Sequence, residues 1–386
     1  MSVTLVKNVG LMLSGEVDRP ILSADSILIA EGVIKAIGRG LEAPPGAAVI
    51  DAQGCAVTPG LIDSHCHLVL GDWTPRQQMQ NYLESSLHGG VTTSISAGEV
   101  HLPGRPKDPT GAKCLAILAA KSWANLRPGG MKVLGGALIL EKGLTEEDIA
   151  ECWQHGVRVV GEVGLGSVKD PDEAAQMVAW AKARGMTVMM HTGGTSIPGS
   201  SVVGPQEVIR VQPSVASHIN GGPTAVDLEG AKAIIDQTQA AIEIVQCGNP
   251  RRAVEVARYI DQTEQWGRVV MGNDAPSGTG VVTLGILRNL ALVASLGQVP
   301  PELALCMATG NTATLYGLRR GRIREGLEAD LVFMDAPMGS PGRDLLAALK
   351  EGDTPGISLV MVDGQVVVKK SRNTPPPKRK AQVVTP

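Results

Sequence analysis

Two histidines separated by a single residue give the strongest chemical signal in the sequence. His65 and His67 lie in the apolar segment 60–70, which has the composition of a β-strand. Side chains alternate faces along a strand, so both imidazoles project to the same side and can share one metal ion. Two histidines that are each satisfied by hydrogen bonds remain the alternative interpretation of this motif taken alone.

Other apolar segments also end in side chains that bind metals. The ionisable residues at the ends of the segments 157–163, 187–191, 215–219 and 269–272 are Glu162, His191, His218 and Asp274. Buried carboxylates and imidazoles need partners, and metal ions would supply partners for all of them at once. Imidazole suits zinc and iron(II) alike, so the residue types do not choose between these metals.

The middle of the chain must position these groups, and it alternates strand-like with helix-like segments. Strand-like runs occur at 60–70, 91–96, 131–140, 157–163, 187–191, 215–219, 241–245 and 269–272. Thr145 and Asp170, the latter followed by Pro171, are typical helix starts. Eight strands alternating with helices favour an α/β fold of the TIM-type (β/α)8 barrel over an open doubly wound sheet. Active sites of such barrels form at the carboxyl ends of the strands.

Both ends of the chain read as short strands separated by turns. We therefore expect a small β-sandwich domain built from residues 1–57 and 319–370, around a barrel at 58–318. The remaining residues, 371–386, are rich in proline and are expected to form a solvated tail. The basic run at 378–380 is interpreted as part of that tail and not as a binding patch.

Composition excludes several classes of protein. The 386 residues are 43% hydrophobic with a formal charge of −3, enough for one large core and a smaller one. Charges of both signs are interspersed, which argues against nucleic-acid or membrane-surface binding. No apolar run is long enough to span a bilayer and the N-terminus lacks signal-peptide features, so a cytoplasmic protein is expected. The glycine-rich loops match neither a phosphate-binding loop nor a dinucleotide fingerprint.

The pattern of candidate ligands resembles that of the amidohydrolase superfamily. So do the sequences VTPGLID at 57–63, ATGNTA at 308–313 and GLEADLV at 326–332, and the resemblance covers nearly the whole chain. It implies two divalent metal ions that activate a water. It also implies one ligand set of His65, His67, Glu162 and Asp274, and a second set of Glu162, His191 and His218.

One position departs from the pattern of many superfamily members, which bridge the two metals with a carboxylated lysine after the fourth strand. Here that strand ends in Glu162, and Lys169 lies well past it. Glu141, at the end of the third strand, is the competing bridge. Glu162 is favoured because its strand is the cleaner one and nearby glycines leave room for metals.

Within the superfamily, the chain is most similar to the branch that opens a lactam ring in bacterial nicotinate fermentation. This implies hydrolysis of 6-oxo-1,4,5,6-tetrahydronicotinate to 2-formylglutarate and ammonia, a zinc and iron(II) pair, and a homotetramer. Asp274 would accept the proton of the attacking water and deliver it to the departing nitrogen. The alternatives are a dihydroorotase- or hydantoinase-like enzyme, an amidohydrolase-type deaminase, or a non-catalytic scaffold with this fold.

A carboxylate-bearing substrate would need hydrogen-bond donors near the strand ends. The candidates, each of which could equally serve the structure of its loop, are Trp73, Lys169, Thr192, Asn220 and Ser277. The last of these precedes a helix whose N-terminus would favour an anion.

Overall fold

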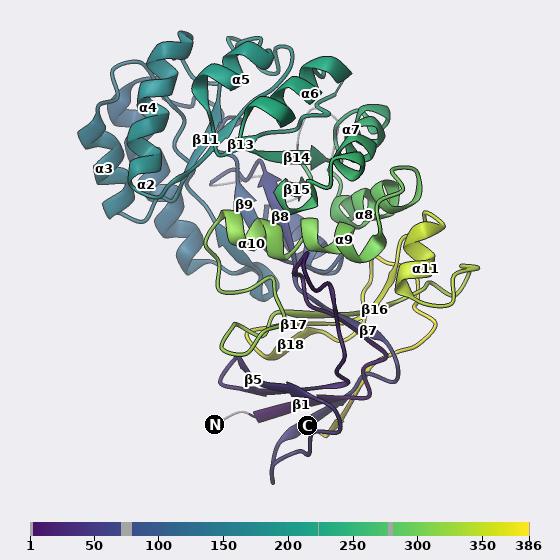
Figure 1. Cartoon of the computed structure of the whole chain (residues 1–386). Coiled ribbons are helices and arrows are strands. Elements are labelled where there is room, and N and C mark those ends of the chain that lie inside the picture. The colour runs from purple at the N-terminus through teal and green to yellow at the C-terminus, as the bar shows by residue number, and fades with distance from the viewer. Residues whose placement is uncertain (1–2, 71–78, 223, 277–280, 386) are drawn as a thin grey trace.

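A closed ring of parallel strands forms the core of the upper part of the molecule in Figure 1, with helices packed around its outside. The computed structural model describes residues 3–70, 79–222, 224–276 and 281–385. Within these ranges the ring consists of β8 (Leu61–Cys66), β9 (Val91–Ser96), β10 (Lys132–Leu134), β11 (Val159–Val163), β12 (Thr187–Met190), β13 (Val215–Ala216), β14 (Ala241–Val245) and β15 (Val269–Gly272). The fold is a TIM-type barrel, as the sequence predicts.

The ring consists of two sheets that are joined by single bridges. Strands β8 to β10 and strands β11 to β15 pair in parallel within their own sheets. Parallel bridges from Leu138 to Val160 and from Cys66 to Ala275 join the sheets at both edges. The third strand is shorter than the expected segment 131–140, because Gly136 has a φ of +78° and interrupts the extended backbone after Leu134.

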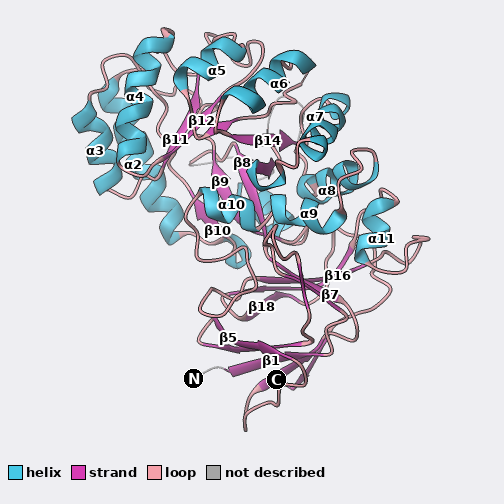
Figure 2. Ribbon diagram, in the orientation of Figure 1, coloured by secondary structure: helices cyan, strands magenta, loops and turns pink. Residues whose placement is uncertain are grey.

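Helices alternate with the strands of the ring and cover it (Figure 2). They are α1 (Met79–Leu87), α2 (Pro109–Asn125), α3 (Glu146–Gln154), α4 (Pro171–Ala183), α5 (Pro205–Val211), α6 (Leu228–Gln237), α7 (Pro250–Gln262), α8 (Gly285–Ser295), α9 (Pro301–Met307) and α10 (Gly310–Leu315). The two predicted helix starts are confirmed: Thr145 caps α3 in a capping box with Asp148, and the side chain of Asp170 accepts a hydrogen bond from the Asp172 amide. Within the described part of the chain, no helix combines the length and the apolar character needed to cross a membrane.

Strands from the two ends of the chain form two further sheets beside the barrel (Figure 1). The first sheet has the order β19-β6-β1-β4-β5 and the second β18-β17-β16-β7-β2-β3. Their bounds are β1 (Val3–Lys7), β2 (Leu11–Leu13), β3 (Ile21–Leu22), β4 (Ser26–Ala30), β5 (Val33–Gly38), β6 (Ala48–Asp51), β7 (Ala56–Pro59), β16 (Leu331–Asp335), β17 (Gly356–Val362), β18 (Gln365–Val368) and β19 (Gln382–Thr385), with α11 (Leu345–Lys350) between β16 and β17. One apolar cluster, which includes Val6 and Ile29 from the first sheet and Met12 and Phe333 from the second, is common to both sheets.

The proline-rich segment that was expected to be a solvated tail packs against these sheets, so that prediction is wrong. Strand β19 pairs antiparallel with β6. The guanidinium of Arg379 lies 2.6 Å from the fully buried carboxylate of Asp335, and the Lys378 ammonium donates to the backbone carbonyls of Ser340 and Gly342. Lys378 and Arg379 are therefore bound to acceptors that are far away in the sequence and that composition does not reveal.

An ion-pair cluster joins the barrel to the second sheet. The Lys132 ammonium, on β10, lies 2.7 Å from a carboxylate oxygen of Glu328, 2.9 Å from one of Asp330 and 2.6 Å from one of Asp363. These three carboxylates are close enough together to suggest a metal site. The lysine ammonium already supplies their cation.

Candidate metal centre

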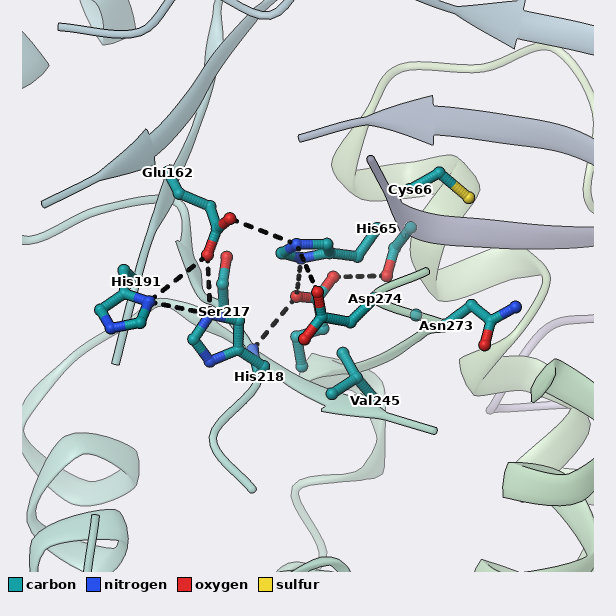
Figure 3. Close-up of polar contacts among 12 residues, drawn as sticks. His65, Cys66, Glu162, His191, Ser217, His218, Val245, Asn273 and Asp274 are labelled. Carbon is teal, nitrogen blue, oxygen red and sulfur yellow. Dashed lines mark hydrogen bonds and ion pairs between the residues drawn. The ribbon is translucent and has the colours of Figure 1, made fainter. Parts of the chain in front are cut away.

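Six side chains from five strand ends converge at the carboxyl end of the barrel. Figure 3 labels all of them except His67. They form two groups, one of His65, His67 and Asp274 and the other of Glu162, His191 and His218. In each group, one possible ligand atom per residue lies within 4.8 Å of the others. The structure thus brings together all six residues that the sequence analysis assigned to the two ligand sets.

Glu162 lies between the two groups (Figure 3). Its Oε1 is 2.7 Å from Nε2 of His218 and 3.7 Å from Nδ1 of His191. Its Oε2 is 3.5 Å from Nε2 of His65 and 3.7 Å from Nε2 of His67. One carboxylate therefore directs an oxygen to each group, which is the arrangement that a bridging ligand requires.

Close approach of the first and last barrel strands holds the first group together. A Cβ at Gly272 would lie 2.6 Å from Cβ of His65, so this glycine allows β15 to come near β8. The amide of Asp274 donates to the His65 carbonyl at 2.8 Å. Asp274 and His218 have φ angles of +56° and +35°, values that are uncommon for residues other than glycine and that cluster at functional sites.

The ionisable groups of the centre keep one another charged. Burial alone would lower the pKa of His65, but the carboxylates of Glu243 and Glu162 raise it well above its ordinary value. Burial alone would raise the pKa of Glu162, but the charges of His65 and His218 hold it well below its ordinary range. The pKa of Asp274 is likewise lowered against the effect of burial, by its hydrogen bond with His67 and the charge of His65.

The nitrogen atoms of the histidines fit divalent cations. Nε2 of His65 is buried without a hydrogen-bond partner among the described residues, and it lies 3.5 Å from Glu162 and 3.6 Å from Asp274 oxygens. These separations are too long for good hydrogen bonds but suit ligands around a common ion. Nε2 of His191 hydrogen bonds to the Gly194 carbonyl at 2.6 Å, which leaves its Nδ1 facing Glu162.

The competing bridge, Glu141, belongs to a different cluster. Its carboxylate pairs with the Arg105 guanidinium at 2.6 Å and accepts a hydrogen bond from the Ser167 amide at 2.8 Å. It is in neither group of potential ligands. Glu162 is thus the carboxylate that the structure places between the two groups.

Two of the candidate substrate-binding residues, Thr192 and Asn220, are hydrogen bonded within the barrel. The Thr192 hydroxyl is buried and donates to the backbone carbonyls of Ser217 and His218. The buried amide of Asn220 exchanges hydrogen bonds with the backbone of Val245. Both side chains are committed to joining neighbouring strands, so their expected role as substrate contacts is not supported.

Of the other three candidates, Lys169 alone lies among the described residues. The Lys169 ammonium donates to the backbone carbonyl of Gly199 in the loop after β12, which accounts for its position without a substrate. Trp73 and Ser277 lie outside the described residues.

Sequence reasoning missed two residues beside the centre. Glu243 on β14 is fully buried and lies 2.7 Å from Nδ1 of His65. A single carboxylate within the apolar segment 241–245 was the signal that could have revealed it. His101 is exposed, and its ring packs edge-on against that of His67 with 4.7 Å between centroids.

Comparisons with known proteins agree with this geometry. The model of the amidohydrolase family matches residues 220–367. Over 386 residues the chain is 55% identical to the enamidase of Eubacterium barkeri, with 100% of both proteins covered. The dihydroorotase of Geobacter sulfurreducens is 29% identical over 177 residues, which cover 46% of this chain and 40% of that protein.

A solved structure of enamidase, described as a member of the amidohydrolase superfamily, aligns with a TM-score of 0.96 at 55% sequence identity. The alignment covers 99% of this chain and 100% of that one. Full-length identity at this level, together with the ligand pattern at the strand ends, shows that the chain belongs to the amidohydrolase superfamily.

Proposed function

We propose that this protein is an enamidase, which hydrolyses the lactam of 6-oxo-1,4,5,6-tetrahydronicotinate. Two water molecules are consumed overall, and 2-formylglutarate and ammonia are released. The observation that carries the proposal is the Glu162 carboxylate between two groups of imidazoles, in a chain that is 55% identical to enamidase along its whole length.

Two divalent cations would be held by the six converging side chains. His65, His67, Glu162 and Asp274 would bind one, and Glu162, His191 and His218 the other. When bound, such cations lower the pKa of a water and polarise an amide carbonyl.

Asp274 is the residue of this chain best placed to move a proton. Its side chain is 19% exposed, whereas those of the other five candidate ligands are at most 7% exposed. Its Oδ1 accepts from Nε2 of His67 at 2.9 Å. We propose that Asp274 takes the proton of the attacking water and returns it to the ring nitrogen as the amide bond breaks.

The full-length similarity favours this function over the other cyclic amidohydrolases. The dihydroorotase match covers less than half of this chain. A glutamate at position 162 also stands where many superfamily members carry the bridging lysine.

The decisive experiment follows ammonia release from 6-oxo-1,4,5,6-tetrahydronicotinate by the metal-loaded protein. Dihydroorotate, hydantoin and adenine serve as comparison substrates. Ring opening of the first two releases no ammonia, so their loss is followed by chromatography, whereas deamination of adenine is followed by ammonia release. We expect the tetrahydronicotinate lactam to be hydrolysed with the highest kcat/KM. Preferred turnover of a comparison substrate would assign a different amidohydrolase activity, and a metal-loaded protein without activity on any of them would contradict the proposal.

The proposal extends to the metals, the assembly and the domain boundaries. We propose a zinc and iron(II) pair, which histidine-rich sites accommodate, in a cytoplasmic homotetramer. We also propose that the two terminal sheets, which are in contact through one apolar cluster, form a small β-sandwich domain beside the barrel. Elemental analysis and multi-angle light scattering test the metal pair and the tetramer.

A further inference from the structure

Glu243 is a fully buried carboxylate whose hydrogen bonds converge on the metal centre. It lies on β14, between the strands that carry His218 and Asp274. Its Oε2 is 2.7 Å from Nδ1 of His65 and 3.2 Å from the backbone nitrogen of His218. Its Oε1 accepts a hydrogen bond of 2.5 Å from the Ser64 hydroxyl.

The contact with His65 selects one tautomer of that imidazole. A carboxylate can only accept, so the proton lies on Nδ1 of His65 and is donated to Glu243. Metal binding removes the proton from Nε2, whose lone pair then points into the centre, where Nε2 faces Glu162 and Asp274 oxygens at 3.5 and 3.6 Å. Histidines that bind metals commonly donate their other N–H to a carboxylate in this way, which fixes the ring and raises its basicity.

The contact with His218 fixes the backbone of a ligand in the other group. His218 has a φ of +35°, which is costly for a residue with a side chain. Its amide donates to the same Glu243 oxygen that holds His65. One carboxylate oxygen is therefore bound to one candidate ligand from each group.

A purely structural role explains Glu243 less well. Burial of a carboxylate costs several kcal/mol unless hydrogen bonds and charge compensate it. The partners that the structure gives Glu243 are His65, His218 and Ser64, which are two candidate ligands and the residue next to one of them. His191, by comparison, donates its outer N–H to a neutral backbone carbonyl.

We propose that Glu243 is a positioning residue, which holds the His65 ring with Nε2 toward the first metal and holds the His218 backbone for the second. The inference rests on the proposed binuclear site. It adds a carboxylate that touches no metal and no substrate but sets the geometry and affinity of the centre.

The test measures metal binding directly. Metal-free wild type, Glu243→Leu, Glu243→Gln and Glu141→Gln are titrated with Zn²⁺ against a chromophoric chelator, after circular dichroism has shown that each is folded. Co²⁺ replaces Zn²⁺ in parallel samples, so that the visible absorption bands report ligand geometry. Glu141→Gln is the matched control, because Glu141 is an equally buried carboxylate that is hydrogen bonded to Arg105 and to the Ser167 amide, both of which lie outside the centre.

We expect wild type and Glu141→Gln to bind two ions per chain with the same affinity. Glu243→Leu should lose roughly 10- to 100-fold in affinity. Glu243→Gln, which keeps an acceptor but not the charge, should lose less and should shift the Co²⁺ bands.

Failure of the proposed function and failure of the proposed role of Glu243 would give different results in this experiment. A wild type that binds no metal contradicts the proposed function, whereas a wild type with two ions and Glu243 variants of equal affinity overturns only the role of Glu243. If the leucine variant does not fold, the glutamine variant decides, because an affinity and a Co²⁺ spectrum identical to wild type would overturn the inference.

Discussion

His67 and Asp274 are 207 residues apart in the sequence, yet Nε2 of the histidine lies 2.9 Å from Oδ1 of the aspartate. They meet because β15, the last strand of the barrel, closes the ring against β8, the first. Asp274 thereby stands at the more accessible side of the candidate metal centre, with 19% of its side chain exposed.

Replacement of Asp274 by asparagine tests its role in proton transfer. Asparagine keeps the shape of the side chain but cannot accept a proton, so we expect kcat to fall about 10²- to 10⁴-fold with little change in KM. Steady-state ammonia release measures both constants. Rates are divided by the metal content of each preparation, and an asparagine variant within a few-fold of wild type would rule out this role.

Glu162→Gln tests the bridging carboxylate. Loss of a charge shared by two groups of imidazoles should reduce metal content from two ions per chain toward one, because each Glu162 oxygen faces a different group. Inductively coupled plasma mass spectrometry gives the stoichiometry. Glu141→Gln removes another buried glutamate and should retain both ions, since Glu141 pairs with Arg105. Retention of two tightly bound ions by Glu162→Gln would argue against a bridge.

Lys132→Met should destabilise the fold. The lysine side chain is 11% exposed and neutralises Asp330, whose side chain is fully buried, so its loss leaves a buried carboxylate without its cation. We expect the free energy of unfolding in urea to fall by about 3 kcal/mol. Lys113→Met is the control, because Lys113 pairs with the partly exposed Asp148 and Glu151 and should contribute less than about 1 kcal/mol. Equal effects of both substitutions would contradict this difference.

Glu99 should make stability depend on pH. Burial raises its pKa to about 7, and within the described part of the chain the Leu70 amide is the only donor that compensates it. The folded state binds the proton of the Glu99 carboxyl more tightly than the unfolded state does. The contribution of Glu99 to the free energy of unfolding is therefore most favourable below pH 4.5 and is lost as the pH rises to about 7. A pKa shift of this size changes the free energy of unfolding by at most about 3 kcal/mol.

Glu99→Gln should remove this dependence, because glutamine stays neutral. The variant should become more stable relative to wild type between pH 5 and pH 7. Urea unfolding of the metal-free proteins measures the difference, so that protonation of metal ligands affects both equally. Glu147→Gln, at an exposed position of α3, should follow wild type. A constant difference between Glu99→Gln and wild type across this range would show that Glu99 does not titrate there.

Much of the barrel and its candidate centre could be predicted from the sequence, because both follow from local patterns. The alternation of side chains along a strand puts His65 and His67 on one side, whatever lies elsewhere in the chain. The carboxyl ends of parallel barrel strands always meet at one face, so Glu162, His191 and His218 could be grouped from their positions at strand ends alone.

Only the tertiary structure decided which partner each remaining polar group has. Glu243 meets His65 across 178 residues, and Arg379 meets Asp335 across 44, through registers that no local pattern encodes. Thr192 and Asn220 have residue types that suit a substrate, but their side chains donate hydrogen bonds to backbone carbonyls of neighbouring strands. A hydrogen bond depends on atoms within about 3 Å of each other, and for distant segments the packing of the whole chain sets that separation.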